Sequence, residues 1–210
     1  MAFAGGLLAR KANIGASFRA AAAKTLDGHP EVLKSLLEHY SLDESATRTL
    51  TDDEALINVL KFISDAAFFM PAVEMASNFT KDAFVLFFNE PNPWDGLFKG
   101  HASHILDVAF LFQNYNEYLD EGQKLSAITF ACDVISFVNG QSPWESFNGG
   151  RKVAASYANG KKTVSELSVS EHTGRSSFIL EIGREESGPG MDALMQIVND
   201  FLRDRSIKHF

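Results

Sequence analysis

A short apolar run closed by two prolines constrains the fold of this chain more than any other feature. Residues 84–88 are five consecutive apolar residues, too few for a stable helix, and the sequence NEPNP follows at once. We therefore predict a buried strand over residues 84–88. Proline lacks a backbone N–H and its ring breaks a helix, so residues 90–100 are predicted to form a surface loop.

A helix is predicted directly after this loop, with His104 at its entrance. Its apolar positions repeat at spacings of three, one and three residues, which is typical of one helix face: Ile105, Val108, Ala109 and Phe112. An imidazole held between a strand-loop unit and a helix can face a cleft and transfer a proton there. His101, three residues earlier in the loop, is the competing candidate.

The remaining periodic segments predict many helices and few strands. Helices are predicted over residues 9–24, 31–40, 51–69, 72–77, 105–114, 121–138 and 192–203. Residues 146–162 are predicted as a polar loop, and strands over 164–169 and 177–182 are predicted to pair as a hairpin around His172. This order is typical of the later part of a doubly wound α/β sheet, so residues 1–210 are predicted to form part of one such domain.

The helix predicted over residues 121–138 is crowded with apolar side chains in its second half. We expect more than one of its sides to be buried, with the single cysteine, Cys132, as a small buried thiol. A single cysteine also excludes an intrachain disulfide.

Several residues around His104 resemble one enzyme family. Gly100, His104, Asp107, Phe110 and Phe112 follow the pattern of the type B carboxylesterases, in which the catalytic histidine follows a glycine-containing loop and precedes an acid and an F-x-F pair. The sequences NPWDG at 92–96 and FVNGQSPW at 137–144 add to the likeness, which covers about residues 7–144. These esterases have the α/β-hydrolase fold and are relatives of the cholinesterases and fungal lipases.

The resemblance implies a serine hydrolase that cleaves carboxylic esters without a cofactor or metal. It implies that His104 is the triad histidine, which takes the proton of the serine and returns it to the leaving alcohol of a small-molecule ester. Only His104 matches the family's catalytic pattern. Asp107 lies one turn along the same helix and is not predicted to be the triad acid.

Two of the three triad members have no counterpart in these residues. The G-x-S-x-G elbow that carries the serine does not occur, and the acid should precede the histidine by about a hundred residues or more, at or before Met1. The chain is therefore expected to be the C-terminal part of an α/β-hydrolase, whose substrate site is completed by a missing half. The alternative is an inactive remnant or truncated gene product that acts as a binding module.

Composition argues against other classes of function. The net charge is -8 and basic residues occur at most in pairs, so a nucleic-acid partner is not expected. His101, His104 and Asp107 lie close in sequence, but zinc needs three or four converging ligands, so no metal is expected. The aromatic residues of two groups are expected to fill the core, with an acyl pocket as the alternative: Phe62, Phe68 and Phe69, and Phe84, Phe87 and Phe88.

The sequence also indicates where the protein resides. No uninterrupted apolar run approaches eighteen residues, so no membrane span is expected. The first residues lack the charged segment and cleavage pattern of a signal peptide, and one cysteine fits a reducing compartment, which favours the cytoplasm.

Overall fold

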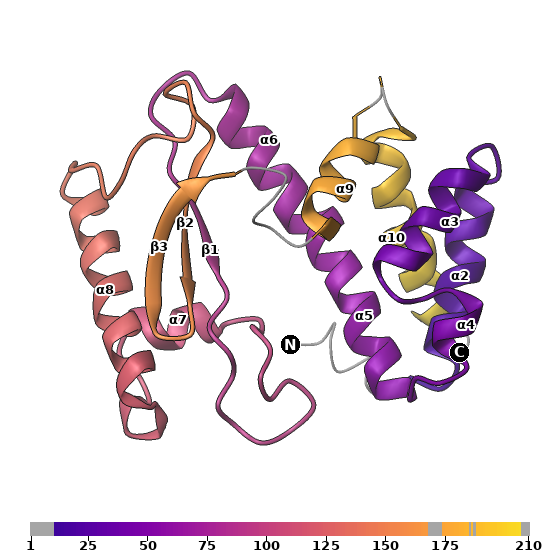
Figure 1. Ribbon diagram of the computed structural model, residues 1–210, viewed down its shortest axis with the longest axis horizontal. Coiled ribbons are helices and arrows are strands. Elements are labelled where there is room, and N and C mark those ends of the chain that lie inside the picture. The colour runs from indigo at the N-terminus through magenta and orange to yellow at the C-terminus, as the bar shows by residue number, and fades with distance from the viewer. Residues whose placement is uncertain (1–10, 168–173, 185, 187, 207–210) are drawn as a thin grey trace. The chain divides into compact units, whose positions relative to one another are not determined.

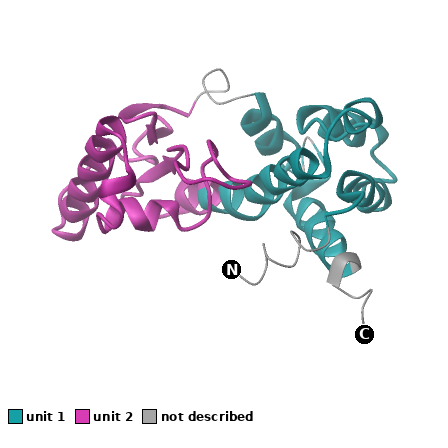
Figure 2. Ribbon diagram, turned by 90° about the horizontal axis from the view of Figure 1, so that it is seen from below, with its two compact units in different colours: residues 1–72, 169–210 teal, residues 73–168 magenta. Residues whose placement is uncertain are grey.

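The chain folds into two compact units. The computed structural model describes residues 11–167, 174–184, 186 and 188–206. Residues 1–72 and 169–210 belong to unit 1, and residues 73–168 belong to unit 2 (Figure 2). No sequence pattern had indicated this division.

Unit 1 is built from helices around an aromatic core. The helices are α2 (Ile14–Thr25), α3 (Pro30–His39), α4 (Glu44–Thr47), α5 (Asp52–Ser64), α9 (Gly174–Ile182) and α10 (Gly190–Ser206) (Figure 1). Phe18 of α2 is fully buried and makes edge-to-face contacts with Phe62 of α5 and Phe201 of α10, at centroid distances of 5.0 and 5.7 Å. The helices predicted at 31–40 and 192–203 are thus confirmed within a few residues, and the helix predicted at 9–24 is confirmed from Ile14 onward.

Helix α5 continues without a break through the π-helical turn η1 (Asp65–Phe69) into α6 (Met70–Asn78). The prediction that a separate helix begins after Met70 is wrong. Pro71 has no N–H to give to the residue four positions earlier, and the wider π turn just before it bonds Met70 N to Asp65 O instead. A local change in helical pitch therefore accommodates the proline.

The continuous helix from Asp52 to Asn78 is apolar enough to be compared with a membrane span. It has 27 residues and a window of mean hydropathy 1.5, so length and composition alone would allow it to cross a bilayer. Half of that window is buried inside the protein, where Leu56, Val59 and Phe62 belong to the core of unit 1. Packing in unit 1 accounts for the apolar character of these three residues.

The prediction of a strand over residues 177–182 is wrong, because this segment belongs to helix α9. Its two buried side chains, Ile179 and Ile182, are three residues apart and share one side of the helix. In a strand, side chains three residues apart would point to opposite faces. The hairpin predicted with 164–169 is therefore absent from the described residues. His172 lies outside them.

Unit 2 contains a small mixed sheet with two helices. Its elements are β1 (Val85–Phe88), α7 (Leu106–Leu111), η2 (Asn116–Tyr118), α8 (Glu121–Val138), β2 (Val153–Ala158) and β3 (Lys161–Glu166) (Figure 1). The strand predicted at 84–88 and the helix predicted at 121–138 are confirmed. The strand is less buried than predicted, because only Val85 is buried and Leu86 is exposed. Strand β2 lies in the stretch predicted as a loop, and that prediction is wrong. Its sequence VAASYA offers little β propensity, yet Ala154 and Ala155 are buried.

The sheet order is β1-β2-β3, with β1 parallel to β2 and β2 antiparallel to β3. Val85 lies opposite Ala154 and Phe88 opposite Tyr157. The connection from β1 to β2 carries α7 and α8, as parallel pairing requires a long crossover. Phe110 of α7 and Phe130 of α8 pack with Tyr157 in one apolar core. The fold is thus mostly helical with a few strands, in keeping with the α/β class predicted.

Candidate functional site

His104 lies in the crossover that follows the carboxyl end of β1. Its side chain is exposed on the turn that precedes α7. In open α/β sheets, ligands bind outside the carboxyl ends of parallel strands, because the loops that follow the strands converge there. His104 lies 16 residues after Phe88, the last residue of β1, on the exposed turn that leads into α7.

Backbone hydrogen bonds close the loop between β1 and this turn upon itself. Asn92 N donates to His101 O at 3.1 Å, and Gly100 N donates to Asn92 O at 2.9 Å. The side chain of Asn92 accepts a hydrogen bond from Trp94 N at 2.9 Å, which forms a local turn. The segment that leads to His104 therefore has a defined path.

Ile105, the residue after His104, has a strained backbone. Its φ is 72° and its ψ is -4°, a left-handed conformation that is a genuine outlier for a β-branched residue. Such a conformation costs about 1–3 kcal/mol, and outliers of this kind cluster at functional sites. The strain lies beside the predicted catalytic residue. Nothing in the sequence indicates it, because isoleucine rarely adopts a left-handed backbone conformation.

The predicted site residues have no mutual hydrogen bonds. His101 and His104 are both exposed, and Asp107 is half-buried in the first turn of α7. Among the described residues, no hydrogen bond or ion pair joins either imidazole to a carboxylate. His104 is thus presented to solvent without the acid and the nucleophile that ester hydrolysis requires.

A buried carboxylate that sequence reasoning missed lies just after β1. Glu90 is fully buried, and its two carboxylate oxygens accept the N–H of Gly160 at 2.9 and 3.2 Å. Gly160 forms the turn between β2 and β3 with φ 74°, so the contact fastens the exit of β1 to the adjacent hairpin. Its position deep in the fold makes Glu90 a structural anchor of the loop that carries the histidines.

The predicted aromatic groups do not form one pocket. Phe62 is core of unit 1, whereas Phe68 is 68% exposed on η1. In unit 2, Phe88 packs against Phe110 at 5.0 Å, and Phe84 contacts Trp144 at 6.1 Å. In the described part of the chain, no three His, Cys, Asp or Glu side chains converge as a metal site.

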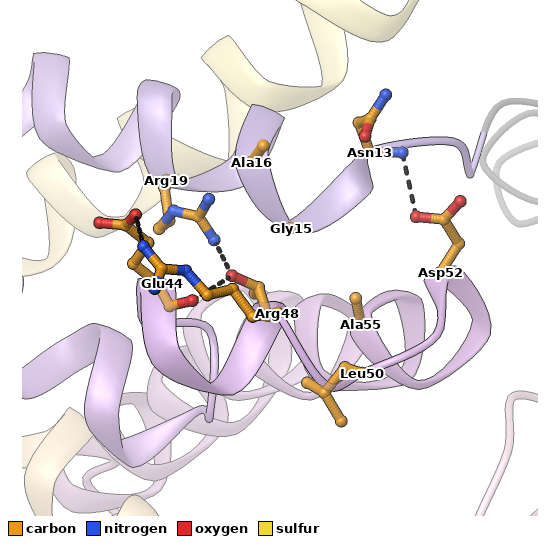
Figure 3. A pocket seen from close by; sticks show the side chains of 10 residues that line it. Asn13, Gly15, Ala16, Arg19, Glu44, Arg48, Leu50, Asp52 and Ala55 are labelled. Atoms are coloured by element: carbon orange, nitrogen blue, oxygen red, sulfur yellow. Dashed lines mark hydrogen bonds and ion pairs between the residues drawn. The ribbon is translucent and has the colours of Figure 1, made fainter.

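A surface hollow of about 260 Å³ lies in unit 1, between α2, α4 and the start of α5 (Figure 3). Its polar groups satisfy one another. Arg48 forms an ion pair with Glu44 at 2.6 Å, Arg19 donates to Leu42 O at 3.3 Å, and the carboxylate of Asp52 accepts Asn13 N at 3.0 Å. Arg19 and Asp52 thus join α2 to the segments beside it, whereas the Arg48–Glu44 pair lies within α4 and its C-terminal cap.

A buried ionic cluster in unit 1 is centred on the carboxylate of Asp65. The carboxylate of Asp65 accepts hydrogen bonds from Tyr40 Oη at 2.8 Å and from Arg175 Nε at 2.6 Å. Burial raises the pKa of the Asp65 carboxyl above its ordinary value, an effect that the Arg175 charge offsets only in part. Burial and the nearby Asp65 raise the pKa of Tyr40 as well. The cluster fastens α9 to η1 and α3.

No known protein family, no curated protein and no solved structure matches this chain. The segment around His104 combines an exposed imidazole, a loop closed by backbone hydrogen bonds and a strained neighbouring residue.

Proposed function

We propose that this chain supplies the general acid-base histidine, His104, of a carboxylic ester hydrolase of the type B carboxylesterase kind. Its fold would be the histidine-bearing part of an α/β-hydrolase, with the serine and the acid carried by sequence other than these 210 residues. The observation that carries the proposal is the exposed position of His104 in the crossover that follows the parallel strand β1.

In this proposal His104 acts first as a general base and then as a general acid. The imidazole takes the hydroxyl proton of the serine as that oxygen attacks the ester carbonyl, and it then gives the proton to the departing alcohol. Deacylation repeats the sequence with water in place of the serine. A carboxylate on the second ring nitrogen would hold the required tautomer, and none of the described carboxylates does so.

The open edge of β1 supports the same proposal. β1 stands at one end of the sheet order and pairs on one side with β2, so its other edge has no partner strand among the described residues. Unpaired edges invite the addition of a strand. A strand added there would bring its own carboxyl end beside the crossover of His104, which is where a serine elbow would have to lie.

A binding module without activity is the second candidate. The observation that favours it is the set of exposed aromatic side chains after α7: Phe112, Tyr115 and Tyr118. Aromatic residues of this kind are enriched in protein interfaces. In this case the surface would capture a partner, and His104 would have no chemical role.

Reconstitution tests the proposed function. The full 210-residue chain is co-expressed with the serine- and acid-bearing part of a type B carboxylesterase, and hydrolysis of a short-chain nitrophenyl ester is measured. Proton transfer by a positioned side chain contributes roughly 10²–10⁴-fold, so His104→Ala should lose at least that much activity. His101→Ala is the matched control, and its activity should stay within a few-fold of the parent.

Two results would count against the proposal. Equal activity of the parent and His104→Ala in an assembled complex would remove His104 from the chemistry. A complex that forms without hydrolysis would favour the binding module. The chain alone should be inactive, because no serine elbow is present to attack the ester.

A further inference from the structure

The outward face of helix α8 carries a narrow apolar stripe, which we call the α8 seam: Leu125, Ile128, Cys132 and Ile135. Cys132 is exposed, and the other three side chains are 51–60% exposed. The prediction that several sides of this helix and the thiol of Cys132 are buried is therefore wrong. Spacings of three, four and three residues are those of the contact positions of a coiled coil.

The α8 seam lies opposite the face by which α8 packs in its own unit. That inner face buries Gln123, Ser126, Ala127 and Phe130. At 3.6 residues per turn, the seam points about 180° away from these residues, and α8 runs alongside β3 of the sheet (Figure 1). A sheet extended at β1 grows in its own plane, so it would not cover the seam. A partner of the seam would instead form a further layer on that side of α8.

The charge pattern of α8 indicates what kind of surface could pack against the α8 seam. Between Leu125 and Val138 the only charged residue is Asp133. Its carboxylate accepts the Tyr157 hydroxyl at 2.6 Å and pairs with Lys162 at 2.7 Å, so it is held by the sheet of its own unit. The seam therefore carries no charge that would repel an identical surface or select an oppositely charged one.

The spacing of the α8 seam is the same in both directions, so two copies of it are complementary when antiparallel. We propose that the occupant is a second copy of this chain, with α8 packed against α8 about a two-fold axis. Leu125 then lies opposite Ile135 of the second copy, and Ile128 lies opposite Cys132 of the second copy. Such a self-complementary contact is the usual basis of a symmetric dimer.

The helix ends favour the antiparallel alignment over the parallel one. In a parallel pair Glu121 would face Glu121 of the second copy, and Lys124 would face Lys124. In the antiparallel pair these residues face Asn139 and Ser136 of the second copy, so like charges are kept apart. Like charges at the flanks of a helical interface oppose pairing.

The mass of the full chain in solution is the first test. Sedimentation velocity should show a dimer for the native chain, and Ile128→Lys and Ile135→Lys should each halve the mass at the same concentration. Met75→Lys, which changes a side chain exposed on α6, is the control and should remain dimeric. Circular dichroism establishes that each variant is folded. A native chain that is monomeric at tens of micromolar would overturn the proposal.

Disulfide cross-linking tests the alignment. Leu125→Cys and Ile135→Cys are made separately in a Cys132→Ser background, with tags of different size, and the two proteins are mixed and oxidised. The antiparallel dimer predicts a cross-link in the mixture and none in either protein alone. A cross-link of Leu125→Cys with itself would overturn the alignment. A monomer whose Cys132 is protected from thiol reagents would show that something other than a second copy covers the seam.

Discussion

Glu90 and Gly160 are joined by a buried hydrogen bond that links the exit of β1 to the turn between β2 and β3. The N–H of Gly160 points at both carboxylate oxygens, at 2.9 and 3.2 Å, and Glu90 has no exposed surface. An N–H that loses such a partner in the interior costs free energy, because water cannot replace it. The path of the histidine-bearing loop therefore depends on this contact.

Removal of the Glu90 carboxylate should destabilise the protein. Glu90→Ala leaves the Gly160 N–H unpaired, so we expect the free energy of unfolding to fall by about 2 kcal/mol. Glu90→Gln keeps an acceptor and should lose less. Urea unfolding followed by circular dichroism measures both. Glu117→Ala, at an exposed position in η2, is the control, and an equal effect of Glu117→Ala and Glu90→Ala would contradict the anchor role.

Gly160 should tolerate no side chain. Its φ is 74°, and a Cβ built there would lie 2.7 Å from the backbone of Gly122. Gly160→Ala combines backbone strain with a clash against main chain, so we expect a loss of about 2 kcal/mol or more in the free energy of unfolding. Gly28→Ala is the matched control, because no atom lies within 4 Å of its Cβ position. Thermal melts that show similar stability for the two variants would contradict this explanation.

The strain at Ile105 should be measurable as a stability gain. Ile105→Gly removes the Cβ from a residue with φ 72°, so we expect the free energy of unfolding to rise by about 1 kcal/mol. Val108 is equally exposed but lies inside α7, where glycine costs about 1 kcal/mol. Opposite signs for Ile105→Gly and Val108→Gly in urea unfolding are the expected result. A loss at both positions would show that the left-handed conformation carries no strain.

The raised pKa of Asp65 predicts a pH dependence of stability. Because the folded state binds this proton more tightly than the unfolded chain, acidification favours the folded state until the pH falls below the ordinary aspartate pKa of about 4. The stability of the native chain relative to Asp65→Asn should therefore increase as the pH falls from about 7 to about 4. Urea unfolding of both proteins at several pH values measures this difference. A decrease on acidification would mean that pairing with Arg175 outweighs burial.

The sequence predicted the elements whose pattern is local. The run at 84–88 became β1, because a short apolar run closed by prolines is a local signal of a strand. The segment at 121–138 became α8, because its length and capping residues are local signals of a helix. Asp120 and Gln123 form a capping box at the start of α8. Strand β2 was missed because small residues such as Ala154 and Ala155 become a strand only through pairing with β1.

The surroundings of His104 were predictable only in part. The proline-closed loop and the helix after it placed the histidine on a turn at the start of a helix, and the structure has it there. The left-handed Ile105 and the contact of Glu90 with Gly160 arise from tertiary packing, for which neither residue type is a signal. The apolar side of α8 was predicted to be buried and is exposed, since amino-acid composition does not distinguish a buried apolar face from an exposed one.

A crystal structure of this chain assembled with the serine- and acid-bearing part of a type B carboxylesterase tests the central claim most directly. Proton transfer requires an imidazole nitrogen within hydrogen-bond reach of the serine oxygen, about 2.6–3.2 Å. We predict that distance for His104, with a strand of the other part paired to the open edge of β1. A serine oxygen that contacts a different histidine, or a His104 ring that stays in bulk solvent in an active assembly, would contradict the proposed role.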